Sequence, residues 1–156
     1  SIRRQRQMCI RDSVIFTGKV WKLTYITKKN EHKPYDFWGD KDKYEQSIKN
    51  YINKEGAYTI KFEGETTDNV SSGKFSGTLL SHSYTGTWSA NGESNAFSAS
   101  VKGSENDPLG FSNKFVEGLN RATSYKGNYD NLFIYYKDEG GRELCLVFHV
   151  DKDNNK

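Results

Sequence analysis

The stretch that decides the fold runs from Gly73 to Ser89 and reads GKFSGTLLSHSYTGTWS. Large apolar residues and glycines occupy every second position in its two halves: Phe75, Gly77 and Leu79, then Tyr84, Gly86 and Trp88. A period of two predicts a pair of half-buried β-strands. Glycine is unfavourable inside a strand, so Gly77 and Gly86 indicate sharp bends or a close approach of neighbouring backbones.

The composition favours one β-rich domain. The chain has 156 residues, a mean hydropathy of −0.87, nine Phe, ten Tyr and three Trp. This length is enough to bury an ordinary core, and no apolar run is long enough to span a bilayer. Aromatic, threonine and glycine residues are typical of sheets, which predicts a mainly β fold.

The positive net charge comes from the first 13 residues. This segment, SIRRQRQMCIRDS, holds four of the 23 basic residues and one of the 20 acidic ones, so the remainder is neutral. It resembles translated sequencing-adapter read-through, and we expect residues 1–13 to be a non-native leader. A basic arm for nucleic acid or a membrane surface is the alternative, but no basic patch elsewhere supports it, so we expect no nucleic acid. We expect one domain over 14–151 and a polar tail over 152–156.

Five further segments alternate as strands do: Val20–Ile26, Ala57–Glu63, Asn95–Gly103, Leu132–Lys137 and Glu143–Val150. Asn91-Gly92 is a strong hairpin signal, and Gly64–Ser72 is interpreted as a polar turn. The first five strands are joined by short links, which predicts an antiparallel meander.

Two segments have helical spacing instead. Apolar residues recur at that spacing over 42–53, where Asp42 and Glu45 resemble a capping pair. The second helix, over about 108–123, is expected to begin at Asp107-Pro108 and to bury one face against the sheet. The predicted fold is mainly β (α+β): an antiparallel, partly open β-barrel or curled sheet, one packed amphipathic helix, and a short inserted helix.

The order of these motifs resembles that of the META domain family, and of its Bacteroidetes-type lipoproteins. The resemblance covers residues 20–148. It rests on these segments: Trp21-Lys22-Leu23, Tyr58-Thr59-Ile60-Lys61-Phe62, Gly73-Lys74-Phe75-Ser76-Gly77, Tyr84-Thr85-Gly86-Thr87-Trp88, Phe115-Val116-Glu117-Gly118-Leu119-Asn120, Ser124-Tyr125, Leu132-Phe133-Ile134-Tyr135-Tyr136 and Leu146-Val147-Phe148. Many members carry a Gly-Cys-Asn turn where this chain has Leu80-Ser81-His82-Ser83, so no role of that turn is transferred.

The resemblance implies a place in the bacterial cell envelope, either periplasmic or as an outer-membrane lipoprotein. A lipid anchor would then sit on a cysteine upstream of this chain and make the only membrane contact. It implies no catalytic chemistry and no cofactor. We expect a monomer that contacts an envelope protein.

The residues themselves also predict no enzyme. His32, His82 and His149 have no partner at metal-ligand spacing. Cys145 has no neighbouring base that would activate its thiol. Glu63, Glu65 and Asp68 are interpreted as a solvated turn, because their spacing fits no calcium loop.

Two functions remain. The first is a non-catalytic module that acts through protein contacts, with Phe37 and Trp38 as candidate contact residues of a loop that otherwise folds over the core. The second is binding of a small apolar ligand in the barrel interior, with Tyr84, Trp88 and Phe97 as candidate lining residues. The second helix is expected to fill that interior, which ranks ligand binding second.

Overall fold

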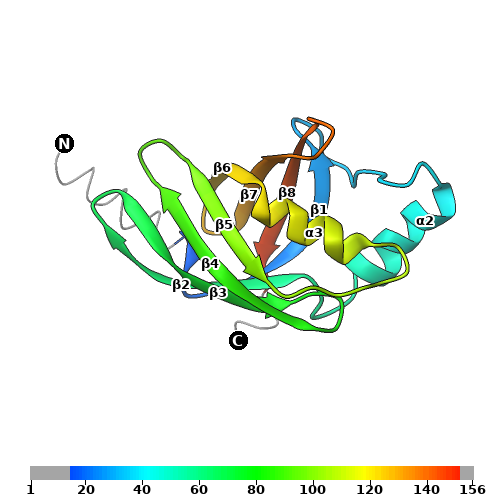
Figure 1. Cartoon of the computed structure of the whole chain (residues 1–156), viewed down its shortest axis with the longest axis horizontal. Helices are drawn as coiled ribbons and strands as arrows, with labels where there is room; N and C mark the ends of the chain where they lie inside the picture. Colours follow the sequence, from blue (N-terminus) through cyan, green and yellow to red (C-terminus); the bar gives the residue numbers. More distant parts are fainter. Residues whose placement is uncertain (1–14, 152–156) are drawn as a thin grey trace.

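The structure is a computed structural model that describes residues 15–151, and it is built on one eight-stranded antiparallel sheet (Figure 1). The strands are β1 (Val20–Lys28), β2 (Thr59–Thr67), β3 (Val70–Thr78), β4 (Ser83–Asn91), β5 (Phe97–Lys102), β6 (Ala122–Gly127), β7 (Asn131–Lys137) and β8 (Glu143–Val150). Their order in the sheet is β5-β4-β3-β2-β1-β8-β7-β6. The first and last strands therefore lie side by side at the centre, and β5 and β6 form the two edges.

The sheet curls until its edges approach each other, but it does not close. Ala96 and Ser124 form a single antiparallel bridge beside β5 and β6, and the Tyr125 N–H donates to the Asn95 carbonyl at 3.0 Å. Beyond this point no ladder joins the two strands among residues 15–151. The predicted curled, partly open antiparallel sheet is confirmed, and the open form is the one observed.

Helix α3 (Phe111–Asn120) lies along the open seam (Figure 1). It buries Phe111, Phe115 and Leu119 in the interior of the curl, as its helical spacing predicts. The Asn120 side chain accepts a hydrogen bond from the Val101 N–H at 2.8 Å, so the helix also satisfies part of the free edge of β5.

The start of α3 differs in detail from the prediction. The helix begins at Phe111, after Gly110 with a φ of 70°, so Pro108 lies before the first turn. Asp107 still acts as the cap, because its carboxylate accepts from the backbone N–H groups of Phe111 and Ser112 at 2.9 and 2.8 Å. A carboxylate at this place satisfies N–H groups that have no partner inside the helix.

The inserted helix forms at the predicted place, with a different cap. Helix α2 (Lys41–Gln46) continues as a π-helical segment, η1 (Ser47–Ile52). Asp40, not Asp42, is the N-cap, and its carboxylate accepts from the N–H groups of Asp42 and Lys43. At the far end the Lys22 ammonium donates to the Ile52 carbonyl at 2.6 Å, which ties η1 to β1.

Four glycines lie where neighbouring strands approach each other closely. A Cβ at Gly64, Gly73, Gly77 or Gly86 would lie 2.0–2.2 Å from a backbone oxygen of the neighbouring strand. No side chain fits at such distances, so only glycine permits this approach of the strands. Of the two roles predicted for Gly77 and Gly86, the close approach of neighbouring backbones is the one observed.

Two predicted boundaries were wrong. The segment 64–72 is not a polar turn, because β2 and β3 extend through it and leave only Asp68-Asn69 between them. Glu63 and Glu65 are consequently strand residues. The second helix also ends at Asn120, and the following residues form β6, a strand that the sequence analysis assigned to the end of the helix.

Aromatic side chains fill the interior of the curl. Phe16, which precedes β1, is fully buried, and its ring centroid lies 5.3 Å from that of Phe62 and 4.9 Å from that of Trp88. The predicted leader over 1–13 lies outside the described residues, as does the tail over 152–156.

Candidate interaction surface

The outer face of β1, β8 and β7 carries a second apolar layer, separate from the interior core. Its members are Tyr25, Phe133, Tyr135, Cys145 and Val147, named here the outer aromatic patch. Cys145 and Val147 are 3% and 7% exposed, while the three aromatic residues are half-buried. Phe133, Tyr135, Cys145 and Val147 do not belong to the continuous hydrophobic core. Tyr25 packs against that core as well as lying in the patch.

Strand register brings the patch together. Val147 lies opposite Tyr25 on one side and opposite Phe133 on the other, and Tyr135 lies opposite Cys145. A β-bulge between Leu23 and Tyr25 in β1 shifts the alternation and turns Tyr25 to this outer face. Because neighbouring strands are about 4.8 Å apart, the rings of Tyr25 and Phe133 flank the smaller side chain of Val147, which lies between them.

Lysines border the patch. Lys126 lies opposite Phe133 on β6, and Lys137 lies two residues beyond Tyr135 on β7. The Lys29 ammonium lies 5.9 Å from the centre of the Tyr135 ring and 3.7 Å from a carboxylate oxygen of Glu143. The border is therefore mainly cationic around an apolar centre.

The residues proposed to line a ligand cavity are packed in the core. Trp88 and Phe97 are 3% and 2% exposed, and the ring centroid of Phe16 lies 4.9 and 5.7 Å from theirs. Tyr84 lies 5.8 Å from Phe115 of α3, also measured between ring centroids, and donates its hydroxyl to the Thr59 carbonyl at 2.7 Å. The helix fills this side of the interior as expected, and Phe16 fills the other.

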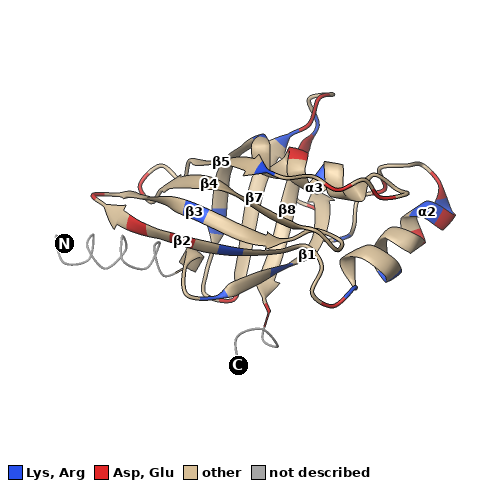
Figure 2. Cartoon of the chain, turned by 60° about the horizontal axis from the view of Figure 1, so that its bottom comes forward, with Lys and Arg blue, Asp and Glu red and all other residues tan. Residues whose placement is uncertain are grey.

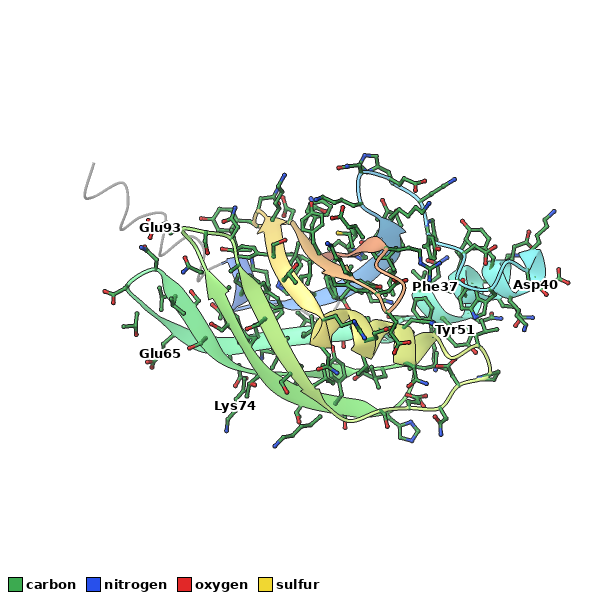
Figure 3. The ribbon with its side chains drawn as sticks, turned by 45° about the horizontal axis from the view of Figure 1, so that its top comes forward. Phe37, Asp40, Tyr51, Glu65, Lys74 and Glu93 are labelled. Atoms are coloured by element: carbon green, nitrogen blue, oxygen red, sulfur yellow. The ribbon has the colours of Figure 1, made fainter. Side chains whose placement is uncertain are left out.

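The loop candidates Phe37 and Trp38 fold over the end of α3. The Trp38 indole N–H donates to the Leu109 carbonyl at 2.8 Å, and Phe37 contacts both Trp38 and the Lys114 ammonium. Both side chains remain half-buried, and Figure 3 shows Phe37 close to the inserted helical segment that contains Tyr51. The two residues act as a lid over the core, in line with the interpretation that the sequence favoured.

The groups with potential chemistry are dispersed. Burial raises the pKa of the Cys145 thiol to about 12, which leaves it protonated and unreactive. The His149 imidazole is bonded through Nδ1 to the Thr24 hydroxyl at 2.7 Å. Among residues 15–151 no three His, Cys, Asp or Glu side chains are placed to hold a metal ion.

The outer aromatic patch was not predicted from the sequence, although a signal was present. In β7 the run Leu132-Phe133-Ile134-Tyr135-Tyr136 is apolar on both faces, and in β8 Cys145 and Val147 alternate with core residues. A strand with one wet face carries polar residues at these positions. The apolar residues at these outward positions of β7 and β8 therefore indicate a second surface that excludes water.

Comparisons with known proteins add a family and a fold. The profile of a family described as a domain of unknown function (DUF4847) matches residues 12–150. The crystal structure of a DUF4847 family protein from Bacteroides vulgatus ATCC 8482 is similar, with a TM-score of 0.63 and 20% sequence identity over 86% of this chain and 94% of that one. At this identity the likeness concerns the fold. No curated protein matches.

Neither match carries the META name, so that resemblance stays a prediction. Within residues 15–151, no helix has the length and apolar character that a membrane crossing requires.

Proposed function

The chain belongs to the DUF4847 family, whose function is unknown, and on that premise we propose that it is a non-catalytic envelope module that acts by contact with another protein. The outer aromatic patch is the contact surface. The observation that carries this proposal is the second apolar layer of Phe133, Tyr135, Cys145 and Val147, which lies outside the core.

The stability of the fold does not require apolar residues on this outer face, so we infer that they serve an interaction. A sheet with one solvated face is stable with polar residues there, and half-buried aromatic residues grouped on a surface are typical of interfaces. Phe133 and Tyr135 provide rigid apolar area for the centre of such a contact, while Lys126 and Lys137 lie at its border. The complementary partner surface has an apolar centre and acidic residues around it.

The proposed setting is the bacterial cell envelope, as the resemblance to META-domain lipoproteins suggests. A lipid anchor upstream of this chain would hold the domain at a membrane surface and leave the sheet free. The domain itself is proposed to be a monomer, with an accessory, stress-response or surface-assembly role. No reaction is assigned to it, because its histidines and its buried thiol are not brought together.

The test is a binding measurement in two stages. The purified domain captures candidates from a bacterial envelope extract, and each purified candidate is then titrated with the domain. Phe133→Ser is expected to weaken that binding by about tenfold or more, because an aromatic anchor is lost. The control Ser98→Ala alters an exposed residue on β5, remote from the patch in the strand order, and is expected to leave binding unchanged.

Circular dichroism confirms that both variants are folded before binding is compared. Equal affinity of the wild-type domain and Phe133→Ser for every purified candidate would remove the outer aromatic patch as the contact surface.

A further inference from the structure

A hollow of about 410 Å³ lies on the outer face of the other half of the sheet, over β2–β5. Its polar side chains come from four strands and are listed in chain order: Glu63, Lys74, Ser76, Thr85, Thr87, Ser100 and Lys102. Phe75 and Gly86 complete the lining. Both alternate with outward-facing residues and therefore face the interior, so they lie beneath the hollow. We name this the hydroxyl hollow.

The strand register sets the geometry of the hollow. Lys74 lies opposite Glu63 on one side and opposite Thr87 on the other, and Lys102 lies opposite Thr85. Two ammonium groups thus flank a row of threonine hydroxyls on β4. Figure 3 shows Lys74 projecting from the sheet on the side away from α3, and Figure 2 shows basic positions on β2 and β3 from below.

Within residues 15–151, the polar side chains of the hydroxyl hollow have no hydrogen-bond or ion-pair partner. Among the hydrogen bonds and ion pairs of residues 15–151, none involves the ammonium of Lys74 or Lys102, the carboxylate of Glu63, or any of the four hydroxyls. All seven polar side chains are exposed, so their donors and acceptors face solvent. Here the donors and acceptors all remain available to a ligand.

A second polar groove, elsewhere on the surface, shows the contrast. The groove between α3 and the β7–β8 hairpin is also lined by charged residues. There the Arg121 guanidinium pairs with Glu117 at 3.3 Å, and the Arg142 guanidinium pairs with Asp138 at 2.7 Å. Those charges form ion pairs, whereas the charges of the hydroxyl hollow form none among residues 15–151.

The floor of the hydroxyl hollow is rigid. From the interior, the Trp88 indole N–H is shared between the backbone carbonyls of Glu63 and Lys74, at 3.1 and 3.2 Å. A Cβ at Gly86 would lie 2.2 Å from the Ser100 carbonyl oxygen, so β4 and β5 are held close together here. A site whose backbone is fixed loses little entropy when a ligand binds.

We propose that the hydroxyl hollow binds an acidic sugar, a hydroxyl-rich ring that carries a carboxylate or sulfate group. The two lysines match the anionic group, while Glu63 and the Ser and Thr hydroxyls exchange hydrogen bonds with the ring hydroxyls. A volume of 410 Å³ is at the lower end of small-molecule pockets and suits one or two sugar rings. This site is independent of the outer aromatic patch, which lies on β1, β8 and β7.

The test titrates the purified domain with galacturonic acid, its short oligomers, galactose 6-sulfate and uncharged galactose, followed by calorimetry and amide NMR. An acidic probe is expected to bind, with shifts at Thr85 and Thr87, and galactose to bind at least about tenfold more weakly. Preference for the oligomers identifies an acidic polysaccharide as the source, and equal binding of the monomer identifies a free sugar acid.

Matched variants locate the site. Lys74→Gln and Lys102→Gln are each expected to raise the Kd of the acidic probe about tenfold, and the control Lys49→Gln, at an exposed position of η1, to leave it unchanged. Absence of binding by every acidic probe, equal binding of galactose, or equal affinity of the two hollow variants and the wild type would each overturn the proposal. All side chains changed are exposed, so folding is preserved.

Discussion

The Glu105 carboxylate binds Ser81 twice: one oxygen accepts the Ser81 backbone N–H at 2.9 Å, and the other accepts its hydroxyl at 2.9 Å. The His82 backbone N–H adds a third hydrogen bond at 2.8 Å. Glu105 is only 7% exposed, and it connects the segment after β5 to the turn between β3 and β4. The carboxylate therefore gives the residues of this turn a structural role.

Replacement of Glu105 by Gln is expected to destabilise the domain by about 1.5–3 kcal/mol at pH 7, because hydrogen bonds to a charged acceptor are lost. Chemical denaturation followed by tryptophan fluorescence measures the change. The control Glu65→Gln alters an exposed strand residue, and its effect is expected to stay within about 0.5 kcal/mol. Equal stability of the two variants would contradict the role of Glu105.

The same carboxylate predicts acid sensitivity. Burial favours a raised pKa for Glu105, but the hydrogen bonds from Ser81 and His82 prevail and lower its pKa from 4.5 to about 2. A lowered folded-state pKa means that the stabilisation is complete above pH 4.5 and is lost as the pH falls toward 2. The difference in unfolding free energy between wild type and Glu105→Gln is therefore expected to shrink over this window. A difference that stays constant from pH 7 to pH 2 would be inconsistent with this assignment.

Lys22 provides a second titration, with the opposite charge. Burial lowers its pKa from 10.5 to about 8, although the nearby Asp151 opposes the change. The unfolded chain then binds more protons between pH 8 and 10.5, so Lys22 contributes a stability that rises with pH in that window.

Lys22→Met removes both this pH dependence and the hydrogen bond to the Ile52 carbonyl. Relative to wild type, the variant is expected to lose stability progressively as the pH is raised from 8 to 10.5. Hydrogen exchange is expected to quicken in η1, which the ammonium holds to β1. The control Lys61→Met lies at an exposed position of β2, and the same behaviour in it would exclude a specific role of Lys22.

Gly86→Ala tests the close approach of β4 and β5. The new methyl group would lie 2.2 Å from the Ser100 carbonyl and 2.4 Å from the Phe75 ring, so the backbone must shift. We expect a loss of about 1–3 kcal/mol in unfolding free energy. Gly140→Ala is the matched control, since its nearest atom would be an ordinary 3.5 Å away. A neutral Gly86→Ala would show that the strands can separate at this point.

Phe16→Ala tests how far the interior depends on a residue that precedes the first strand. Its ring contacts Phe62, Trp88, Phe97 and Tyr125, and its removal leaves a cavity among them. The expected loss is about 3–5 kcal/mol, measured by thermal or chemical unfolding. Phe133→Ala, on the outer aromatic patch, is expected to cost much less, because Phe133 lies outside the core. A smaller loss for Phe16→Ala than for Phe133→Ala would reverse this assignment of the core.

Local periodicity was sufficient for most of the fold. Strands that alternate strictly, such as those around Phe75 and Tyr84, were predicted because their faces differ in polarity. The strand over 122–127 was missed, because Ala122 continues the spacing of α3 and only its pairing with β7 identifies it as a strand residue. The inserted helix was predicted, but neither its π-helical second half nor the hydrogen bond from Lys22 to the Ile52 carbonyl was.

The candidate sites divide in the same way. The sequence placed Phe37 and Trp38 in a loop, yet the contact of the Trp38 indole with Leu109 is a tertiary feature. The outer aromatic patch and the hydroxyl hollow each join residues from three or four strands. No single segment contains enough of either surface to distinguish it from an ordinary strand.

The stretch from Gly73 to Ser89 by itself determined two strands, the faces that they bury, and the glycines that mark a close approach of backbones, because side-chain alternation and the absence of a Cβ are local properties. The tertiary structure alone decided that the sheet remains open between β5 and β6, that Phe16 and α3 fill the interior, and which outward residues meet. These features depend on the register between strands distant in the chain, which local sequence leaves unspecified.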